Sequence, residues 1–153
     1  MIASLFKVAL LAFLPVSEVR GAIPYGVLGA RLPITLVLPV ALLGNIVPYF
    51  LVMYLLQVAL KLFCKMEWFD RLFERYTEGV KRRFKKYAQW ERWGILFFVG
   101  VPLPFTGVWT GSLICFLGGL SLRESFPFVL GGLLLATSIV TVVTLLGYNL
   151  GSF

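Results

Sequence analysis

Long uncharged stretches of apolar residues occupy most of this chain. Three of them, at 32–60, 93–122 and 125–153, each hold enough residues to cross a bilayer, for which about 20 are needed. Two shorter apolar stretches, at 8–17 and 21–30, precede them. This pattern predicts an all-α integral membrane protein with several membrane-embedded helices.

The first apolar arm of each half is too short to cross a membrane. As helices, residues 4–14 and 93–101 would be roughly 16 and 13 Å long, against a hydrocarbon core of about 30 Å. Prolines at positions 15, 102 and 104 follow these arms. We therefore expect two re-entrant helical hairpins, each followed by one long transmembrane helix. The alternative is that each arm pair is a single kinked spanning helix, which would make four crossings.

A basic segment at 61–92 separates the two apolar halves. It contains ten of the fourteen Lys and Arg residues and five of the seven acidic ones. Its apolar positions recur with helical spacing, which predicts an amphipathic helix at the membrane interface, where the basic cluster at 81–86 would attract anionic lipids. Short loops rich in Lys and Arg stay in the cytoplasm, so we place this linker there, in a protein of the cell membrane. Because the segment is tethered to the membrane, we expect no nucleic-acid partner.

The sequences on the two sides of this linker form an internal repeat. A shift of 89 residues superimposes prolines and small residues, and a shift of 88 continues the match into the long helices. The matched pairs are Pro15 with Pro104, Ser17 with Thr106, Ala22 with Gly111, Gly26 with Cys115, Gly29 with Gly118, Pro39 with Pro127, and Gly44 with Gly132. One crossing per half gives the halves opposite orientations, as in the inverted repeats of many secondary transporters. We therefore expect one membrane domain over 1–153, with half-repeats at 1–60 and 93–153.

Two opposite charges stand beside the first break, in the stretch Glu18-Val-Arg-Gly-Ala-Ile-Pro24. They are unusual in a chain that is 59% hydrophobic and 14% charged, with a net charge of +7 and a mean hydropathy of +0.92. That composition excludes an ordinary soluble domain. An ionisable side chain at bilayer depth costs from about 2.5 to more than 10 kcal/mol, so it usually faces a cavity or a partner. A charge pair next to a helix break therefore predicts a functional site.

Each charge has a functional and a structural interpretation. A carboxyl withdrawn from water can exchange a proton near neutrality, so Glu18 is a candidate proton carrier, or it holds the backbone through a salt bridge to Arg20 or Arg31. The planar guanidinium of Arg20 suits bidentate binding of phosphate, or it only neutralises Glu18. Arg31 contributes to the pathway or reaches the lipid headgroups. We expect Gly21 and Pro24 to break the second arm beside these charges.

The second break contributes polar groups without charge. Thr106 and Thr110 offer hydroxyls next to backbone amides that the prolines leave free, and Trp109 stands between them as a ligand or a packing aromatic. The turn itself is shaped by Pro102, Pro104, Gly107 and Gly111.

No residue pattern points to enzymatic chemistry. The chain has no histidine, and Cys64 and Cys115 lie in separate segments without metal-ligand spacing. No nucleophile stands with a general base. We expect a protein that is not an enzyme and that uses no metal and no cofactor.

The stretches Glu18-Val-Arg-Gly-Ala-Ile-Pro24 and Pro102-Leu-Pro-Phe-Thr-Gly-Val-Trp-Thr-Gly111 resemble the two signature motifs of the small multidrug export protein family. That family is grouped with the DedA (SNARE-associated, VTT-domain) superfamily, and the resemblance covers essentially the whole chain. It implies a DedA-like inverted repeat with two re-entrant hairpins facing each other. Members of the superfamily are implicated in moving polyprenyl-phosphate carriers or scrambling phospholipids, often with proton coupling. Many carry an arginine in the second re-entrant segment, whereas 93–122 is uncharged here.

These observations predict a membrane transporter that translocates or scrambles a lipid phosphate, with proton coupling through Glu18. The expected partners are protons and anionic or phosphate-bearing membrane lipids. The sequence leaves open whether the protein forms a homo-oligomer. The alternative is a proton-coupled exporter of cationic drugs, which needs one membrane carboxylate. A non-transporting scaffold would need only the fold, and the membrane charges argue against it. The substrate, the direction of transport and the coupling ion are not specified by the sequence.

Overall fold

The structure is a computed structural model that describes residues 1–63, 92–103 and 106–150. These residues form helices joined by short turns, with no strand among them. In chain order the elements are α1 (Ile2–Phe13), α2 (Glu18–Pro24), the π-helical turn η1 (Tyr25–Gly29), α3 (Ile34–Phe63), a short helix at 92–100, α5 (Val108–Leu117) and α6 (Leu122–Leu150). The all-α prediction is confirmed for this part of the chain. The predicted amphipathic helix of the linker falls mainly on residues 64–91, outside the described residues.

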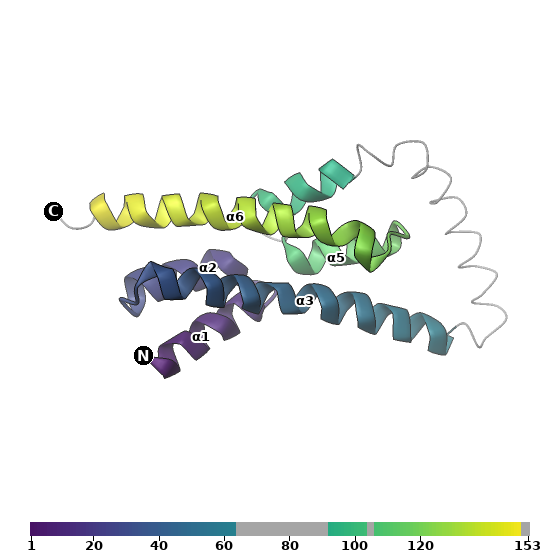
Figure 1. The fold of residues 1–153 in the computed structure, drawn as a ribbon, viewed down its shortest axis with the longest axis horizontal. Helices are drawn as coiled ribbons and strands as arrows, with labels where there is room; N and C mark the ends of the chain where they lie inside the picture. Colours follow the sequence, from purple (N-terminus) through teal and green to yellow (C-terminus); the bar gives the residue numbers. More distant parts are fainter. Residues whose placement is uncertain (64–91, 104–105, 151–153) are drawn as a thin grey trace.

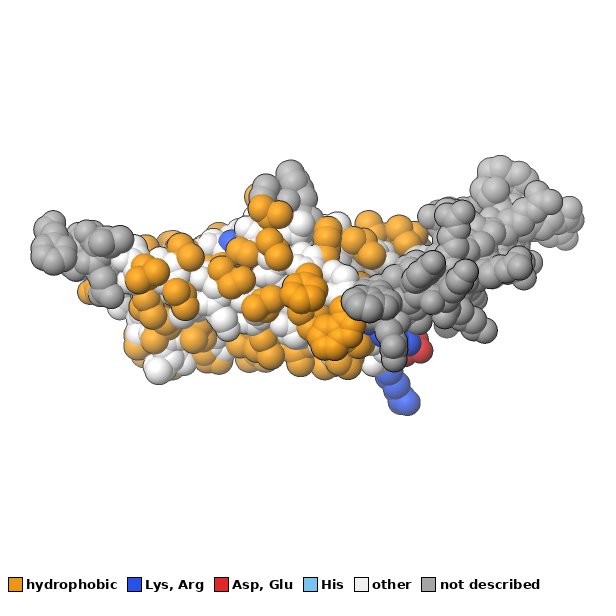
Figure 2. All heavy atoms as spheres, turned by 90° about the horizontal axis from the view of Figure 1, so that it is seen from above, with side chains coloured by type: hydrophobic (Ala, Val, Ile, Leu, Met, Phe, Trp, Pro, Cys, Tyr) orange, Lys and Arg blue, Asp and Glu red, His pale blue; other side chains and the backbone are white. Residues whose placement is uncertain are grey.

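The helices α3 and α6 are the two longest elements, and they run in opposite directions along the long axis of the molecule (Figure 1). Their segments Ile34–Leu60 and Leu122–Tyr148 are long and apolar enough to cross a membrane, with mean hydropathies of 2.1 and 2.3. The face in Figure 2 is hydrophobic over most of its length, with one basic patch part-way along it and a group of charged side chains at one end. So large an exposed apolar surface fits a lipid environment better than water.

Each long helix is preceded by a pair of shorter helices that fold back on each other (Figure 1). The first pair is α1 followed by α2 with η1, and it returns to the end at which α3 begins. The second pair is the helix at 92–100 followed by α5, and it returns toward the start of α6. The points at which the two pairs turn, after α1 and after the helix at 92–100, lie near the middle of the molecule (Figure 1).

Proline accompanies both turns. Helix α1 ends at Phe13, two residues before Pro15, and the helix at 92–100 ends shortly before Pro102. The residue before a proline is disfavoured in helical conformation, because the proline ring clashes with its backbone. The two helix ends predicted from these prolines are therefore present.

The second arm of the first pair differs from the expectation. Gly21 and Pro24 do not break it, because both lie inside α2. The chain instead passes Pro24 by widening into η1, where the Ala30 N–H donates to the Tyr25 carbonyl five residues earlier at 2.8 Å. A π-turn of this kind absorbs a local irregularity without ending the helical path. The break in the first half is confined to residues 14–17.

Glycine lets each long helix pack closely on the first arm of its own half. A Cβ on Gly44 of α3 would lie 2.8 Å from the backbone oxygen of Ala9 in α1. A Cβ on Gly132 of α6 would lie 2.6 Å from the backbone oxygen of Leu96. Small residues at helix crossings give the close approach that drives packing in lipid. These two glycines are also the pair matched by the 88-residue shift, so the two halves use the same device.

The halves are joined by an exchange of partners. The second arm α2 packs against α6, and α5 packs against α3. Each hairpin is therefore held by the long helix of the other half as well as by its own.

The start of α6 is fixed by a capping box and by α3. The hydroxyl and backbone N–H of Ser121 donate to Glu124 Oε2 at 2.8 and 3.0 Å, which closes the box. The Tyr49 hydroxyl of α3 donates to the Leu122 carbonyl at 2.7 Å and lies 2.9 Å from Ser125 Oγ. Tyr49 and Ser125 are buried, so the bonds of the Tyr49 hydroxyl tie the middle of α3 firmly to the first turn of α6.

Candidate functional site

The two helix breaks contact each other, although about 90 residues separate them in the sequence. The indole Nε1 of Trp109 donates to the carbonyl of Phe13 at 2.8 Å. The rings of the same two residues meet edge to face, with centroids 5.6 Å apart. The last carbonyls of α1 have no partner within their own helix, and Trp109 satisfies one of them.

Arg20 extends from α2 to the second break. Its Nη1 donates to the Leu103 carbonyl, and its Nη2 donates to Thr106 Oγ1 at 3.2 Å. Leu103 lies in the turn that follows the helix at 92–100, where its carbonyl also accepts from the Thr106 N–H at 3.2 Å. Thr106 Oγ1 also donates within its own turn, to the Val101 carbonyl at 2.8 Å. Arg20 thus holds the turn at which the helix at 92–100 ends.

Glu18 is buried with 5% of its surface exposed, and it faces the first turn of α5. A Cβ built on Gly107, the N-cap residue of α5, would collide with both carboxylate oxygens of Glu18. The backbone N–H groups of Val108 and Trp109 interact with the same carboxylate. The N–H groups of a first helical turn lack partners and carry partial positive charge, so a carboxylate there is stabilised. Gly107 has a φ of −172°, which is ordinary extended backbone that any residue can adopt. Glycine is therefore needed at this position for space and not for its backbone conformation.

The two charges of α2 therefore match the two broken helix ends of the second hairpin. The cation meets the Leu103 carbonyl in the turn after one helix, and the carboxylate meets the first amides of the next helix. The placement of the carboxylate agrees with the sign of the helix dipole. Glu18 and Arg20 also approach each other to 3.9 Å. This arrangement explains why the second break carries no charges of its own.

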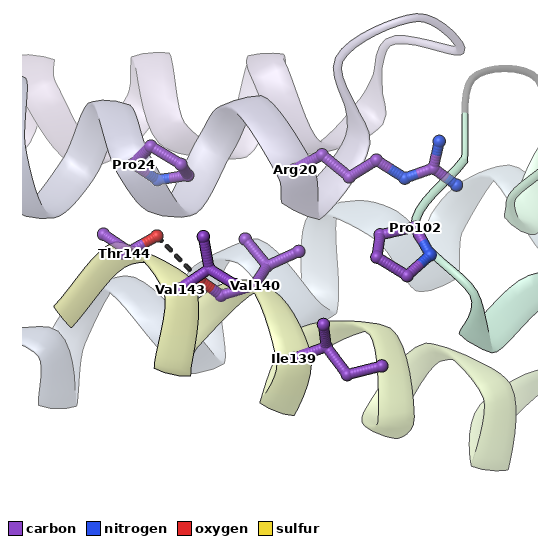
Figure 3. A pocket seen from close by; sticks show the side chains of 7 residues that line it. All are labelled: Arg20, Pro24, Pro102, Ile139, Val140, Val143 and Thr144. Carbon is purple, nitrogen blue, oxygen red and sulfur yellow. Dashed lines mark hydrogen bonds between the residues drawn. The ribbon is translucent and has the colours of Figure 1, made fainter. Parts of the chain in front are cut away.

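An open pocket of about 260 Å³ lies beside this contact, between α2 and α6. Arg20 and Pro24 line it from α2, and Pro102 lines it from the second break (Figure 3). The α6 side is formed by Ile139, Val140, Val143 and Thr144. Arg20 is the one charged residue among these lining residues. The Thr144 hydroxyl is turned to its own helix, where it donates to the Val140 carbonyl at 2.7 Å.

Glu18 is not part of the pocket lining, because its carboxylate is directed at α5. Its burial disfavours the charged form, whereas Arg20 and the two α5 amides favour it. The backbone of Glu18 has φ +48°, a conformation that residues other than glycine rarely adopt. Such strain persists where surrounding contacts hold a residue in place, as the contact with α5 does here.

The remaining predicted residues are divided between this site and its surroundings. Of the two arginines considered as partners of Glu18, the structure brings Arg20 to it, and Arg31 is exposed with φ +51° after η1. Gly21 makes room for Ser17, whose side chain would collide with an added Cβ. Gly111 makes room for Val99 in the second hairpin, because a Cβ added at position 111 would lie 2.5 Å from Val99 Cγ2. Thr110 is half-buried in α5, and Pro104 lies outside the described residues.

Sequence reasoning missed the residues that act through their backbone and those that come from α6. The carbonyls of Phe13 and Leu103 bind Trp109 and Arg20, and a carbonyl has no signature in the sequence. The pocket wall at 139–144 belongs to an uncharged, mainly apolar part of α6, so no pattern marked it. Within the described residues there is no group of three or more His, Cys, Asp or Glu side chains close enough to hold a metal ion.

A family model described as "Putative small multi-drug export protein" matches residues 18–139. The chain belongs to the small multidrug export protein family. The match begins at Glu18 and spans both helix breaks and the pocket wall of α6 as far as Ile139. A family of export proteins is not typically enzymatic, and its description agrees with the transporter class predicted from the sequence. Neither the curated proteins nor the solved structures contain a match to this chain.

Proposed function

We propose that this export-family protein translocates or scrambles an anionic amphiphile, namely a lipid phosphate such as a polyprenyl-phosphate carrier or a phospholipid. The observation that carries the proposal is the pocket between α2 and α6, with apolar walls and Arg20 as its charged lining residue. A long apolar chain fits such walls, and a guanidinium is the side chain best suited to a phosphate. The pocket is open, so a lipid can enter it from the side.

Arg20 retains donor capacity for a ligand. A guanidinium has five N–H donors, and the contacts with Leu103 and Thr106 engage one donor on each terminal nitrogen. Its Nε is buried and has no hydrogen-bond partner among the described residues. A phosphate would compete with the Leu103 carbonyl for the same cation, and the charge would favour the phosphate.

An inverted repeat of the DedA type, with two re-entrant hairpins, is the architecture we propose for this transport. The matched glycines at 44 and 132 and the exchange of partners between the halves support it. So does the contact between Glu18 and Gly107, which are paired by the 89-residue shift. Two equivalent residues of an inverted repeat contact each other only next to the axis that relates the repeats. There is room for one side chain at the contact between Glu18 and Gly107, which accounts for glycine at position 107.

Replacing Arg20 tests the substrate proposal. In vesicles containing the purified protein, we expect Arg20→Ala to reduce lipid-phosphate transport at least tenfold, the value of one charge-assisted hydrogen bond. Arg20→Lys keeps the charge without the planar fork, and we expect an intermediate rate. Arg31→Gln is the matched control, because it removes an exposed arginine away from the pocket. If Arg20→Ala moves lipid phosphate as well as the parent, the proposal is wrong.

A cationic dye, offered to the same vesicles, tests the second candidate function. The description of the matching family model names multi-drug export, which favours this candidate. We expect the protein to transport the lipid phosphate and not the cationic dye, because the charge lining the pocket is positive. Transport of the dye alone would favour a drug exporter.

We also propose that the basic linker is cytoplasmic in the cell membrane and that both chain termini lie on the opposite side. Single cysteines at positions 83 and 152, in a cysteine-free background, test this with a thiol reagent that does not cross membranes. We expect labelling from outside the cell at 152 and protection at 83. The reverse result would invert the orientation, and labelling of both would contradict one crossing per half.

A further inference from the structure

A groove at the start of α6 combines aromatic side chains with one arginine. It has a volume of about 310 Å³ and is lined by Phe50 of α3 and by Leu122, Arg123 and Phe126 of α6. The Phe50 and Phe126 rings lie 5.6 Å apart between centroids. The lining of the groove is therefore apolar apart from the guanidinium of Arg123.

Contacts behind the groove hold its walls in place. The Tyr49 ring lies 5.1 Å from that of Phe50 and 5.6 Å from that of Phe126. Its hydroxyl is bonded to the Leu122 carbonyl, so three of the lining residues contact one buried tyrosine. Because the walls are ordered in advance, a ligand would not lose free energy in ordering them.

The groove lies at the end of the apolar span of α6, which begins at Leu122 next to the charged residues Arg123 and Glu124. The apolar span of α3 continues to Leu60, about 15 Å past Phe50 at 1.5 Å per residue. Arg123 is therefore placed at the level of the lipid headgroups, on the side to which the linker connects.

The charges around the groove favour an anion. Arg123 is exposed, whereas Glu124 is bonded to Ser121 and lies 3.8 Å from Arg92. Two arginines and one glutamate leave a net positive charge in this part of the described chain. A cation at a helix N-terminus is also disfavoured by the helix dipole, so Arg123 gains nothing from α6 itself. An external anion would offset that cost.

We propose that this groove binds one anionic phospholipid from the leaflet on the linker side. Its phosphate contacts the guanidinium of Arg123, and one acyl chain lies along Phe50 and Phe126. The site is separate from the transport pocket, which is lined by residues 139–144 farther along α6. The lipid here is a bound component of the protein, and its binding does not depend on the proposed function.

Native mass spectrometry of the purified full-length protein tests this binding, with phosphatidylglycerol and phosphatidylcholine offered separately. We expect the parent to retain one phosphatidylglycerol with about a fivefold preference over phosphatidylcholine, the value of one basic residue near a membrane surface. Arg123→Gln should lose this preference, and Arg123→Lys should keep it. Arg31→Gln is the matched control, since it removes an exposed arginine outside the groove, and it should also keep it.

Equal retention of both lipids by the parent would overturn the proposal. A loss in Arg31→Gln as large as that in Arg123→Gln would overturn it too, because the effect would then be one of overall charge. Phe50→Ala should weaken retention of both lipids alike, since the acyl chain is common to them. Unchanged retention in Phe50→Ala would refute the position given to the chain.

Discussion

Replacing Glu18 with glutamine is expected to lower transport at least tenfold at every pH between 5 and 8, while thermal unfolding stays near that of the parent. Glutamine has the same shape, and its amide oxygen can still accept from the first N–H groups of α5. It cannot take up or release a proton, and it cannot form an ion pair with Arg20. The fold should therefore tolerate the change, while a mechanism that uses the charge of Glu18 should not.

Two measurements on the same preparation separate the functional from the structural role of this carboxyl. Transport in vesicles across the pH range reports the function, and the unfolding temperature in detergent reports the fold. Glu124→Gln is the matched control, because Glu124 is the other acid in the described residues and serves as the cap of α6. We expect this control to transport normally. Normal transport by Glu18→Gln would rule out Glu18 as a proton carrier. Failure of Glu18→Gln to fold would show that the main role of the Glu18 carboxyl is to cap α5.

Gly132→Ala is expected to lower the free energy of unfolding by about 1–3 kcal/mol, the usual cost of overpacking a tight contact. The new Cβ would lie 2.6 Å from the Leu96 carbonyl oxygen and 2.8 Å from Val99 Cβ. Because the first of these is a backbone atom, a whole helix must move to make room. Gly44→Ala should show a similar loss, since its Cβ would meet the backbone of Ala9.

The matched control for this change is Gly147→Ala in the same helix. Nothing lies within 4 Å of a Cβ at that position, so we expect no loss of stability. Thermal or denaturant unfolding of the purified variants in one detergent measures both. If Gly132→Ala unfolds at the same point as Gly147→Ala, the close crossing of α6 and the helix at 92–100 is not what stabilises the second hairpin.

The helical elements follow from local properties of the chain. Uninterrupted apolar windows determine the lengths of α3 and α6, and Pro15 and Pro102 mark where the first arms end. The same reasoning was wrong for Gly21 and Pro24. A helix passes these residues when its neighbours and a local π-turn compensate for the missing N–H, and a single sequence does not show whether such support is present.

The sequence by itself determined that the described part of this chain is helical, and that the chain is largely apolar, broken twice, and charged at one of the two breaks. Only the tertiary structure decided what those charges contact. Glu18 meets the amides of Val108 and Trp109, and Arg20 meets the carbonyl of Leu103, all more than 80 positions away. Backbone groups carry no mark in a sequence. The pocket likewise needs α2 and α6 together, because each helix alone presents an ordinary apolar face. Local patterns record where a helix breaks, whereas the partner of each broken end is set by which distant segment packs beside it.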